Sequence, residues 1–386
     1  MIAYLEISGL LSLSTWVLVL LPNFLAERGW SSQRIGWAVG CYFLVNLIFQ
    51  IVSGRLADRY GYIRTALAGA VIVTGGGILY VGSLWITGMI WPARALHAMG
   101  AAMIFAGALL HLVQSVPLHL RGRMIGYYGL PGFAMIGLGP VLAEWLVCQW
   151  GFRAVFLCVP ILSAVIGAVL WRLPRSFSPS TAKLQSFPEA FRVTFPPLRS
   201  ILTFSVLFGL CFAAWNSFIA PAVRSVGTGG VSGFGFGYGA GAVMTRLGVS
   251  HRLDTGWRRY PAIATLIAYG ASVALVPSAR SAGQLLALGF ACGMVHGIYY
   301  PSLSSIAAER FHPLHTGQAM SLYLSASALG MFVGPPLWGA LVDRWGYPPM
   351  FVAAGSVMTL GTLIFLVAHH RLTRPSGRNQ ISPPRF

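Results

Sequence analysis

Charge is scarce in this sequence. Only 9% of the 386 residues are charged, whereas a soluble globular protein has roughly 25% charged residues. Apolar residues make up 56% of the chain, and the mean hydropathy is +0.71. A chain of this size with so little charge cannot cover a water-soluble fold with polar surface. The composition therefore excludes a large soluble protein and predicts an integral membrane protein in contact with the lipid bilayer.

Signatures of common pumps and enzymes are also missing. The single lysine, Lys183, lies in a polar stretch and belongs to no G-x-x-x-x-G-K-[ST] loop, so we expect no ATP-driven pump within this chain. Neither H-E-x-x-H nor G-x-S-x-G occurs, so the sequence gives no reason to expect an enzyme. The five cysteines lie singly in apolar runs without a C-x-x-C pair, and we expect no disulfide, no metal site and no cofactor. They are Cys41, Cys148, Cys158, Cys211 and Cys292.

Twelve apolar segments dominate what is present. A helix that crosses the hydrocarbon layer of a bilayer needs about 20 predominantly apolar residues, and these segments meet that length. They leave no room for a sizeable soluble domain. We therefore predict an all-α integral membrane fold with twelve transmembrane helices. The segment centres lie near residues 14, 44, 75, 101, 134, 163, 212, 239, 268, 295, 328 and 359.

Basic residues are distributed unevenly between alternate loops. Of the 26 Lys and Arg residues, 19 fall in the loops on one predicted side of the membrane. Loops rich in Lys and Arg stay in the cytoplasm, so both termini and the loop between segments six and seven are predicted to be cytoplasmic. The arginines lie singly or in small groups between apolar runs. The net charge of +18 therefore indicates membrane topology rather than nucleic-acid binding.

The two halves of the sequence resemble each other. A shift of 195 residues aligns several Gly, Pro and aromatic positions without a gap, and a polar stretch separates the halves. We predict two pseudo-symmetric six-helix bundles at residues 1–174 and 201–370, a cytoplasmic linker at 175–200 and a basic cytoplasmic tail at 371–386. Duplicated units of this kind can rock about a central site. The aligned pairs are Gly122 and Gly317, Tyr128 and Tyr323, Gly139-Pro140 and Gly334-Pro335, Leu142 and Leu337, Trp150-Gly151 and Trp345-Gly346, and Phe156 and Phe351.

One predicted cytoplasmic loop contains a specific motif. Residues 54–64 read GRLADRYGYIR, which resembles the G-x-L-[AS]-D-R-x-G-[RK]-[RK] motif of the major facilitator superfamily. Arg94 with Gly100 is similar to the family's R-x-x-x-G-x-G pattern, and Gly139-Pro140 occupies the start of its G-P-x-x-G-G motif. Each pattern has departures. In the first motif Tyr62 and Ile63 replace the basic pair, in the second Ala98 and Ala102 replace glycines, and in the third Ala143-Glu144 replaces the two glycines.

This resemblance covers essentially the whole chain and is closest to bacterial sugar-efflux and drug-efflux permeases. It implies a secondary active transporter that binds a small organic solute between its halves and exposes the solute to one side at a time. It further implies proton-coupled export (an antiporter) by a monomer in the bacterial plasma (inner) membrane. Three alternatives stay open: a transport-inactive sensor or assembly partner, a facilitative or symport uptake carrier, and an intramembrane enzyme.

The motif loop is also a candidate conformational latch, formed by Gly54, Asp58, Arg59 and Gly61. A glycine lets a helix end approach its neighbour, and an aspartate flanked by arginines can pair across the loop or face a helix N-terminus. We interpret Asp58 as a residue that holds one conformational state. The alternative is that these charges only determine topology.

Arg94 is the most informative residue of the first half. A guanidinium at the centre of a membrane helix costs at least about 2.5 to 3.5 kcal/mol on insertion scales, so it should face a cavity or a partner rather than lipid. His97 follows three residues later on the same helix face. We expect Arg94 and His97 to form an anion-attracting or proton-coupled site. The alternatives are an arginine that only joins helices and a histidine that only packs.

Glu144 is the one acidic residue far inside a predicted span, apart from Glu6 near the start of the chain. A carboxyl group in a low-dielectric setting can carry protons, which makes Glu144 a candidate for proton coupling. The alternative is a carboxylate that reaches the outer rim beside Trp145.

The second half offers candidates at helical spacing. His296, Tyr299 and Tyr300 share a helix face, and Trp215 and Asn216 are neighbours on segment seven. We expect these side chains to contact the solute or to couple protons. Interhelical packing is the alternative for each of them.

Segment eight is unusually rich in glycine. As a helix it places Gly233, Gly237 and Gly241 on one face and Gly235 and Gly239 on the opposite face. Such small-residue ridges favour close helix packing, and no following lysine supports nucleotide binding. We assign a packing function to the first three of these glycines and to Gly139, Pro140, Gly334 and Pro335.

Overall fold

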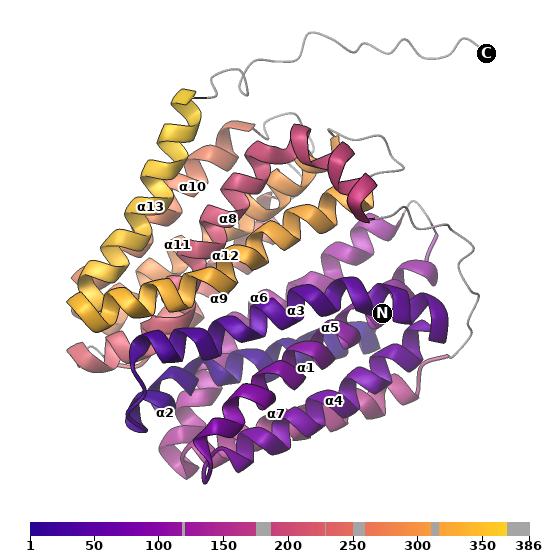
Figure 1. Cartoon of the computed structure of the whole chain (residues 1–386), viewed down its shortest axis with the longest axis horizontal. Coiled ribbons are helices and arrows are strands. Elements are labelled where there is room, and N and C mark those ends of the chain that lie inside the picture. The colour runs from indigo at the N-terminus through magenta and orange to yellow at the C-terminus, as the bar shows by residue number, and fades with distance from the viewer. Residues whose placement is uncertain (118–119, 175–186, 228, 250–258, 310–315, 369–386) are drawn as a thin grey trace.

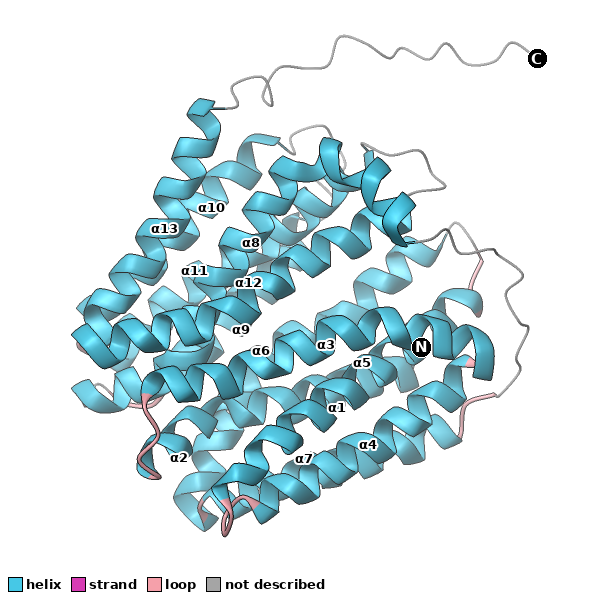
Figure 2. Cartoon of the chain, in the orientation of Figure 1, coloured by secondary structure: helices cyan, strands magenta, loops and turns pink. Residues whose placement is uncertain are grey.

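The computed structural model describes residues 1–117, 120–174, 187–227, 229–249, 259–309 and 316–368, and the regular structure within these ranges is helical (Figure 2). Lys183 and the predicted tail at 371–386 lie outside the described residues.

The helices follow one another along the chain, and η denotes a 3₁₀ helix. The elements are α1 (Ile2–Trp16), η1 (Val17–Leu20), α2 (Leu21–Glu27), α3 (Ser32–Tyr60), α4 (Tyr62–Gly82), η2 (Thr87–Met89), α5 (Ile90–Gln114), α6 (Arg121–Trp150), α7 (Phe152–Trp171), α8 (Phe187–Val226), α9 (Ser232–Val249), α10 (Arg259–Ala274), η4 (Val276–Ser278), α11 (Ala282–Glu309), α12 (Thr316–Trp345) and α13 (Tyr347–Ala368).

Within the part of the chain that the structure describes, twelve helical segments fit a membrane crossing. Within the described residues, ten helical segments are long and apolar enough to do so, and the first of them, Ile2–Glu27, joins α1, η1 and α2. The shorter apolar stretch Ala264–Ser278 and the glycine-rich α9 complete the set. The 18 residues of α9 span about 27 Å, which is close to the thickness of the hydrocarbon layer. The predicted fold class is confirmed.

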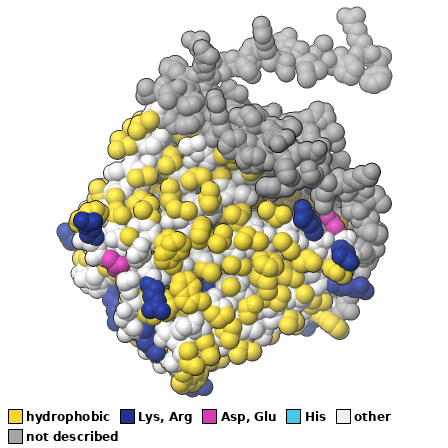
Figure 3. Space-filling view, viewed as in Figure 1, with side chains coloured by type: hydrophobic (Ala, Val, Ile, Leu, Met, Phe, Trp, Pro, Cys, Tyr) yellow, Lys and Arg dark blue, Asp and Glu magenta, His cyan; other side chains and the backbone are white. Residues whose placement is uncertain are grey.

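Large apolar side chains remain exposed on the outer faces of the helices. Val71 is 73% exposed, Ile78 62% and Ile364 67%. Hydrophobic side chains cover the middle of the face seen in Figure 3, and Lys and Arg side chains lie toward its edges. An apolar band between two charged rims fits the hydrocarbon layer and its two interfaces.

The helices form two bundles, α1–α7 and α8–α13, which lie against each other (Figure 1). Corresponding turns of the two bundles have the same backbone geometry. Gly151 between α6 and α7 has φ +71°, and Gly346 between α12 and α13 has φ +81°. Glycine adopts this region without the steric cost that a Cβ would add. The Trp-Gly pairs of the internal repeat therefore end equivalent helices in the same way.

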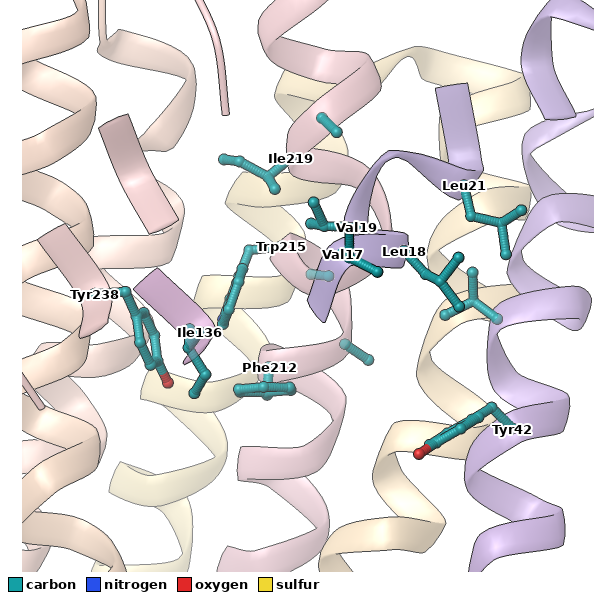
Figure 4. Packing of buried hydrophobic residues seen from close by; sticks show 14 of the residues in the cluster. Val17, Leu18, Val19, Leu21, Tyr42, Ile136, Phe212, Trp215, Ile219 and Tyr238 are labelled. Carbon is teal, nitrogen blue, oxygen red and sulfur yellow. The ribbon is translucent and has the colours of Figure 1, made fainter. Parts of the chain in front are cut away.

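The first crossing is interrupted by η1. All four η1 residues are buried, and Pro22 stands in the first turn of α2, where its missing N–H costs no helical hydrogen bond. In Figure 4 the labelled residues of η1 lie between Trp215 of α8 and Tyr42 of α3. The interruption thus places irregular backbone at the centre of the molecule, where the two bundles meet.

The sequence placed the end of the linker at residue 200, but α8 already begins at Phe187. Phe187, Phe191 and Phe195 recur every four residues in this stretch. That spacing makes one apolar stripe on a helix, although charged and polar residues separate the phenylalanines.

Candidate functional site

A cavity of about 350 Å³ lies between the two bundles. Its volume is within the range of small-molecule sites, roughly 300 to 1,000 Å³. Both halves contribute to its wall. The lining residues are Thr15, Trp16, Leu18, Val19, Leu21, Pro22, Val39, Tyr42, Phe43, Arg94, Gly129, Gly132, Phe133 and Ile136 from the first half, and Phe212, Asn216, His296 and Met331 from the second.

Arg94 of α5 reaches the wall of this cavity with 5% of its surface exposed. Its Nε donates to the carbonyl of Ala38 at 3.2 Å, and its Nη2 donates to the carbonyl of Val39 at 2.9 Å. The guanidinium carbon lies 4.7 Å from the ring centroid of Tyr42. Arg94 therefore joins α5 to α3 and is also one of the residues that line the cavity.

His97 lies behind Arg94 rather than on the cavity wall. Its side chain is fully buried, its Nε2 is 3.3 Å from the hydroxyl of Ser14, and its ring meets those of Tyr42 and Tyr80 edge-on. Its Nδ1 has no hydrogen-bond partner within the described part of the chain. The predicted pairing of Arg94 with His97 on one face is present, but only Arg94 lines the cavity.

A chain of hydrogen bonds runs through the second bundle and ends at His296. Nε1 of Trp215 donates to the hydroxyl of Tyr269 at 2.7 Å, and the hydroxyls of Tyr269 and Tyr238 are 3.3 Å apart. The Tyr238 hydroxyl is 2.6 Å from Nδ1 of His296, whose ring lines the cavity. Four helices, α8 to α11, supply one residue each. Tyr238 and Tyr269 were not singled out in the sequence, because buried tyrosines have no spacing signal that separates a network from packing.

Aromatic rings form much of the wall near this chain. Trp16 stacks on Trp215 with centroids 5.9 Å apart, and Phe212 meets Trp215 edge-on at 4.8 Å. Figure 4 shows Phe212 and Trp215 on α8, with Ile136 of α6 between them and Tyr238.

The other candidates of the second half lie in different places. Asn216 lines the cavity, as does His296. Tyr299 is 1% exposed and stacks on Phe208 at 4.3 Å, and it is not among the lining residues. The side chain of Tyr300 lies outside the described part of the structure.

Glu144 lies at the rim where the bundles meet, and it does not line the central cavity. Its carboxylate accepts hydrogen bonds from the backbone N–H groups of Val231 and Ser232, the latter at 3.2 Å. These groups begin α9 in the opposite half and have no helical acceptor. A carboxylate there satisfies them and interacts favourably with the helix dipole.

Asp343 makes the reciprocal contact. It belongs to α12, and its two oxygens accept from the N–H groups of Ser32 at 2.7 Å and Gln33 at 2.9 Å, at the start of α3. An exposed ion pair between Glu27 and Arg224 also joins the halves. Sequence reasoning missed Asp343, because its partners lie more than 300 residues away and no local pattern identifies them.

The contacts of Glu144, Asp343 and Glu27 lie at the same end of the molecule, and they include all hydrogen bonds found between the two halves in the described residues. The loops at this end contain few basic residues. Glycines let the helices approach there: a Cβ at Gly36 or Gly339 would overlap backbone of the partner helix.

The glycines of α9 face two neighbours. Cβ atoms at Gly237 and Gly241 would overlap carbonyl oxygens of α11, and Gly233 is also nearest to that helix. Gly235 and Gly239 instead contact α6 of the first half. The remaining packing candidates also lie in helix contacts: Gly139 against Trp16, Gly334 against Ala213, Pro140 against Gly235, and Pro335 against Gly36.

The predicted latch lies at the turn between α3 and α4. Gly61 has φ +99° and ends α3. Arg59 lies 5.2 Å from the ring centroid of Tyr60, and a Cβ at Gly54 would meet no other atom within 4 Å. Asp58 forms no ion pair with the described residues. No group of three potential metal ligands was found in the described ranges either.

The family model of the Major Facilitator Superfamily matches residues 7–279 and 248–384, which together span nearly the whole chain. The chain belongs to the major facilitator superfamily. It is thus a multi-pass membrane protein of a family of secondary transporters that handle small solutes. This major facilitator protein is 24% identical over 364 residues to an uncharacterized MFS-type transporter of Salmonella typhimurium, an alignment that covers 90% of each chain.

Solved transporters have the same fold. The nucleoside transporter NupG aligns with a TM-score of 0.75 at 15% identity, covering 94% of this major facilitator protein and 98% of NupG. The human organic anion transporter MFSD10 aligns with a TM-score of 0.69 at 15% identity, covering 94% of this chain and 97% of the other. At such identities the likeness concerns the fold alone.

Proposed function

We propose that this protein exports a small organic solute from the cytoplasm in exchange for protons, by alternating access of the central cavity. The observation on which the proposal rests is that this cavity lies between two six-helix bundles, and that the hydrogen bonds joining the bundles within the described residues all lie at one end. Rocking of the bundles would break these contacts and expose the same cavity to the opposite side.

The direction of export is supported by topology. The closed end is formed by loops with few basic residues, and the basic loops lie at the opposite end. By the positive-inside rule the closed end faces away from the cytoplasm, with both termini cytoplasmic in a bacterial plasma membrane. The described conformation then suits loading from the cytoplasm, which is the first step of export. A periplasm-specific reporter fused to the C-terminus should be inactive, and an active reporter would reverse the assignment.

Proton coupling is supported by the titratable ring of His296 on the cavity wall. Histidine changes charge within the physiological pH range unless its surroundings prevent it. The guanidinium of Arg94 lines the same cavity, so protonation of His296 would add a second positive charge to one compartment. Glu144 lies at the rim instead, where we assign it to closure between the halves.

The transport experiment uses the purified full chain in proteoliposomes with an imposed pH gradient. Lumenal pH is followed with a trapped dye while candidate solutes are added, and solute movement is followed by mass spectrometry. We expect a solute to move against its own gradient, with proton movement in the opposite direction that a protonophore abolishes. Solute movement with protons in the same direction would identify an uptake symporter. Binding without any flux would identify a sensor.

A further inference from the structure

The polar groups on the cavity wall differ in charge and in whether they donate or accept hydrogen bonds. Arg94 can only donate hydrogen bonds and stays positively charged. Two of its nitrogens bind carbonyl oxygens of α3. No carboxylate within the described ranges forms an ion pair with it. A nearly enclosed cation without a counter-ion favours entry of an anion.

The hydrogen-bond chain behind His296 determines which ring nitrogen holds the proton. Trp215 is a donor only, so the Tyr269 oxygen accepts its hydrogen. The single hydroxyl hydrogen of Tyr269 has Tyr238 as its one acceptor in the described part of the chain. Tyr238 then donates its own hydrogen to Nδ1 of His296. Since Nδ1 accepts, neutral His296 holds its hydrogen on Nε2.

This polarity places a second donor on the cavity wall. Nε2–H of His296 has no hydrogen-bond partner among the residues that the structure describes, and the ring lines the cavity in the half opposite Arg94. The polar groups of Thr15, Tyr42 and Asn216 can donate or accept, and the indole N–H of the lining residue Trp16 can only donate. No Asp or Glu is among the described lining residues, so the wall offers no carboxylate to a cationic solute.

A second guanidinium lies behind the wall. Arg246 of α9 is 5.1 Å from the ring centroid of Phe133, and the same ring lies 5.1 Å from that of His296. Phe133 lines the cavity. Positive charges around a low-dielectric cavity raise the local concentration of anions.

The remaining wall is apolar and partly flat. The rings of Trp16, Phe133 and Phe212 and the side chains of Ile136 and Met331 line the cavity. Aromatic faces suit a planar apolar body, because stacked and edge-on contacts between rings are both favourable.

We propose that the solute is an organic anion with a planar apolar body, whose carboxylate-like head binds Arg94 and whose second acceptor atom receives the Nε2–H of His296. The inference rests on the proposed function, since it names the chemical class that occupies the same cavity. Binding of the anion requires neither flux nor proton coupling, so the class can be tested separately.

Thermal-shift titration of the purified full chain with matched ligands tests the class. The probes are the carboxylate of 1-naphthylacetic acid, its primary amide and the corresponding 2-(1-naphthyl)ethylamine. The phenyl and indole equivalents form two further sets. Members of each set share a body and differ in charge. We expect the carboxylate of at least one set to bind at least roughly tenfold more tightly than its amide and its amine, the size of one charge-assisted hydrogen bond. Equal or stronger binding of the amides or amines overturns the proposal, and so does a lack of binding by all three carboxylates.

Matched variants locate the site. Arg94→Gln should weaken carboxylate binding by roughly 10- to 100-fold. The control Arg28→Gln should leave binding unchanged, because Arg28 also donates to a carbonyl, that of Leu84, and faces the Phe24 ring, but it is exposed and does not line the cavity. Unchanged carboxylate binding in Arg94→Gln overturns the proposal.

A second pair of variants keeps the test valid if Arg94→Gln does not fold. His296→Leu removes the donor from the wall, whereas His296→Gln retains an N–H group. We expect His296→Leu to weaken carboxylate binding several-fold more than His296→Gln does. Equal affinity in both variants and the unmodified chain overturns the second donor contact. Carboxylate binding without proton-driven flux would instead refute the proposed function and leave the ligand class intact.

Discussion

Asp343 near the end of α12 caps the helix that begins at Ser32 in the opposite bundle, with 2.7 Å between Oδ1 and the backbone nitrogen. Glu144 of α6 does the same for α9. Each bundle thus contributes one carboxylate to the first turn of a helix in the other. Because a charge-assisted hydrogen bond is roughly twice as strong as a neutral one, these two sites stabilise closure of this end.

Removing the two caps should favour the conformation that is open at this end. Glu144→Ala and Asp343→Ala should each shift the equilibrium by about 1.5 to 3 kcal/mol, the value of a hydrogen bond to a charged group. The shift is measured by maleimide labelling of single cysteines placed at each end of the cavity. The double variant should show nearly additive shifts, since the two caps share no residues. Glu6→Ala is the control, because Glu6 is exposed on α1 and takes part in none of the hydrogen bonds that join the halves within the described residues. Identical labelling in the cap variants and the control would show that the caps do not hold the closed state.

The variant Arg94→Lys should transport poorly, because we expect Arg94 to contribute more than its positive charge. Lysine keeps the positive charge but cannot reproduce the planar fork that binds the carbonyls of Ala38 and Val39. We expect transport by Arg94→Lys and Arg94→Ala to fall at least about tenfold, since one hydrogen bond to a charged group contributes about 1.5 to 3 kcal/mol. Solute flux in proteoliposomes is the measurement, with a gel-filtration profile to establish folding. Normal flux in Arg94→Lys would leave only the charge as essential. Normal flux in Arg94→Ala would make the residue structural.

Gly237→Ala should destabilise the second bundle. A Cβ there would overlap the carbonyl oxygen of Leu286 on α11, a backbone atom that cannot rotate away. Overpacking of this kind costs roughly 1 to 3 kcal/mol. The control is Gly75→Ala in α4, where a Cβ would meet nothing within 4 Å, and alanine favours the helix by up to about 1 kcal/mol. Thermal unfolding in detergent should separate the two variants in opposite directions. Equal stability of both would remove the packing argument for the α9 glycines.

The variant Asp58→Asn should destabilise the alternative conformation, in which the end opposite to the two caps is closed. Asp58 has no ion pair with the described residues here, so a latch role requires a partner that forms when the other end closes. We expect the substitution to shift the equilibrium toward the present conformation by about 1 to 3 kcal/mol, a usual size for conformational coupling. The same cysteine labelling measures it, and a shift of opposite sign to that of the cap variants is expected. Unchanged labelling with normal flux would reduce Asp58 to a topology charge.

Several features were predictable because they depend on local or periodic sequence properties. The scarcity of charge and the length of the apolar segments predicted twelve crossings, since a bilayer excludes unsatisfied backbone groups and leaves helices as the simplest solution. The two glycine ridges of α9 followed from helical periodicity, and the duplicated plan from the internal repeat. The start of α8 at Phe187 was not predictable in this way, because charged and polar residues separate the phenylalanines that recur there every four residues.

The sequence by itself determined that the protein lies in a lipid bilayer, how many helices it has and that it consists of two similar halves. It also showed that the guanidinium of Arg94 is costly to bury in a membrane helix. Each of these features depends on composition, on the internal repeat or on residues within a few helical turns of one another. Only the tertiary structure decided that Arg94 and His296 share one cavity while His97 and Tyr299 do not. It also decided that Glu144 and Asp343 cap helices of the opposite bundle, and that Trp215, Tyr269 and Tyr238 form a hydrogen-bond chain to His296. These relationships join residues tens to hundreds of positions apart, and they arise from the packing of whole helices, which no local pattern specifies.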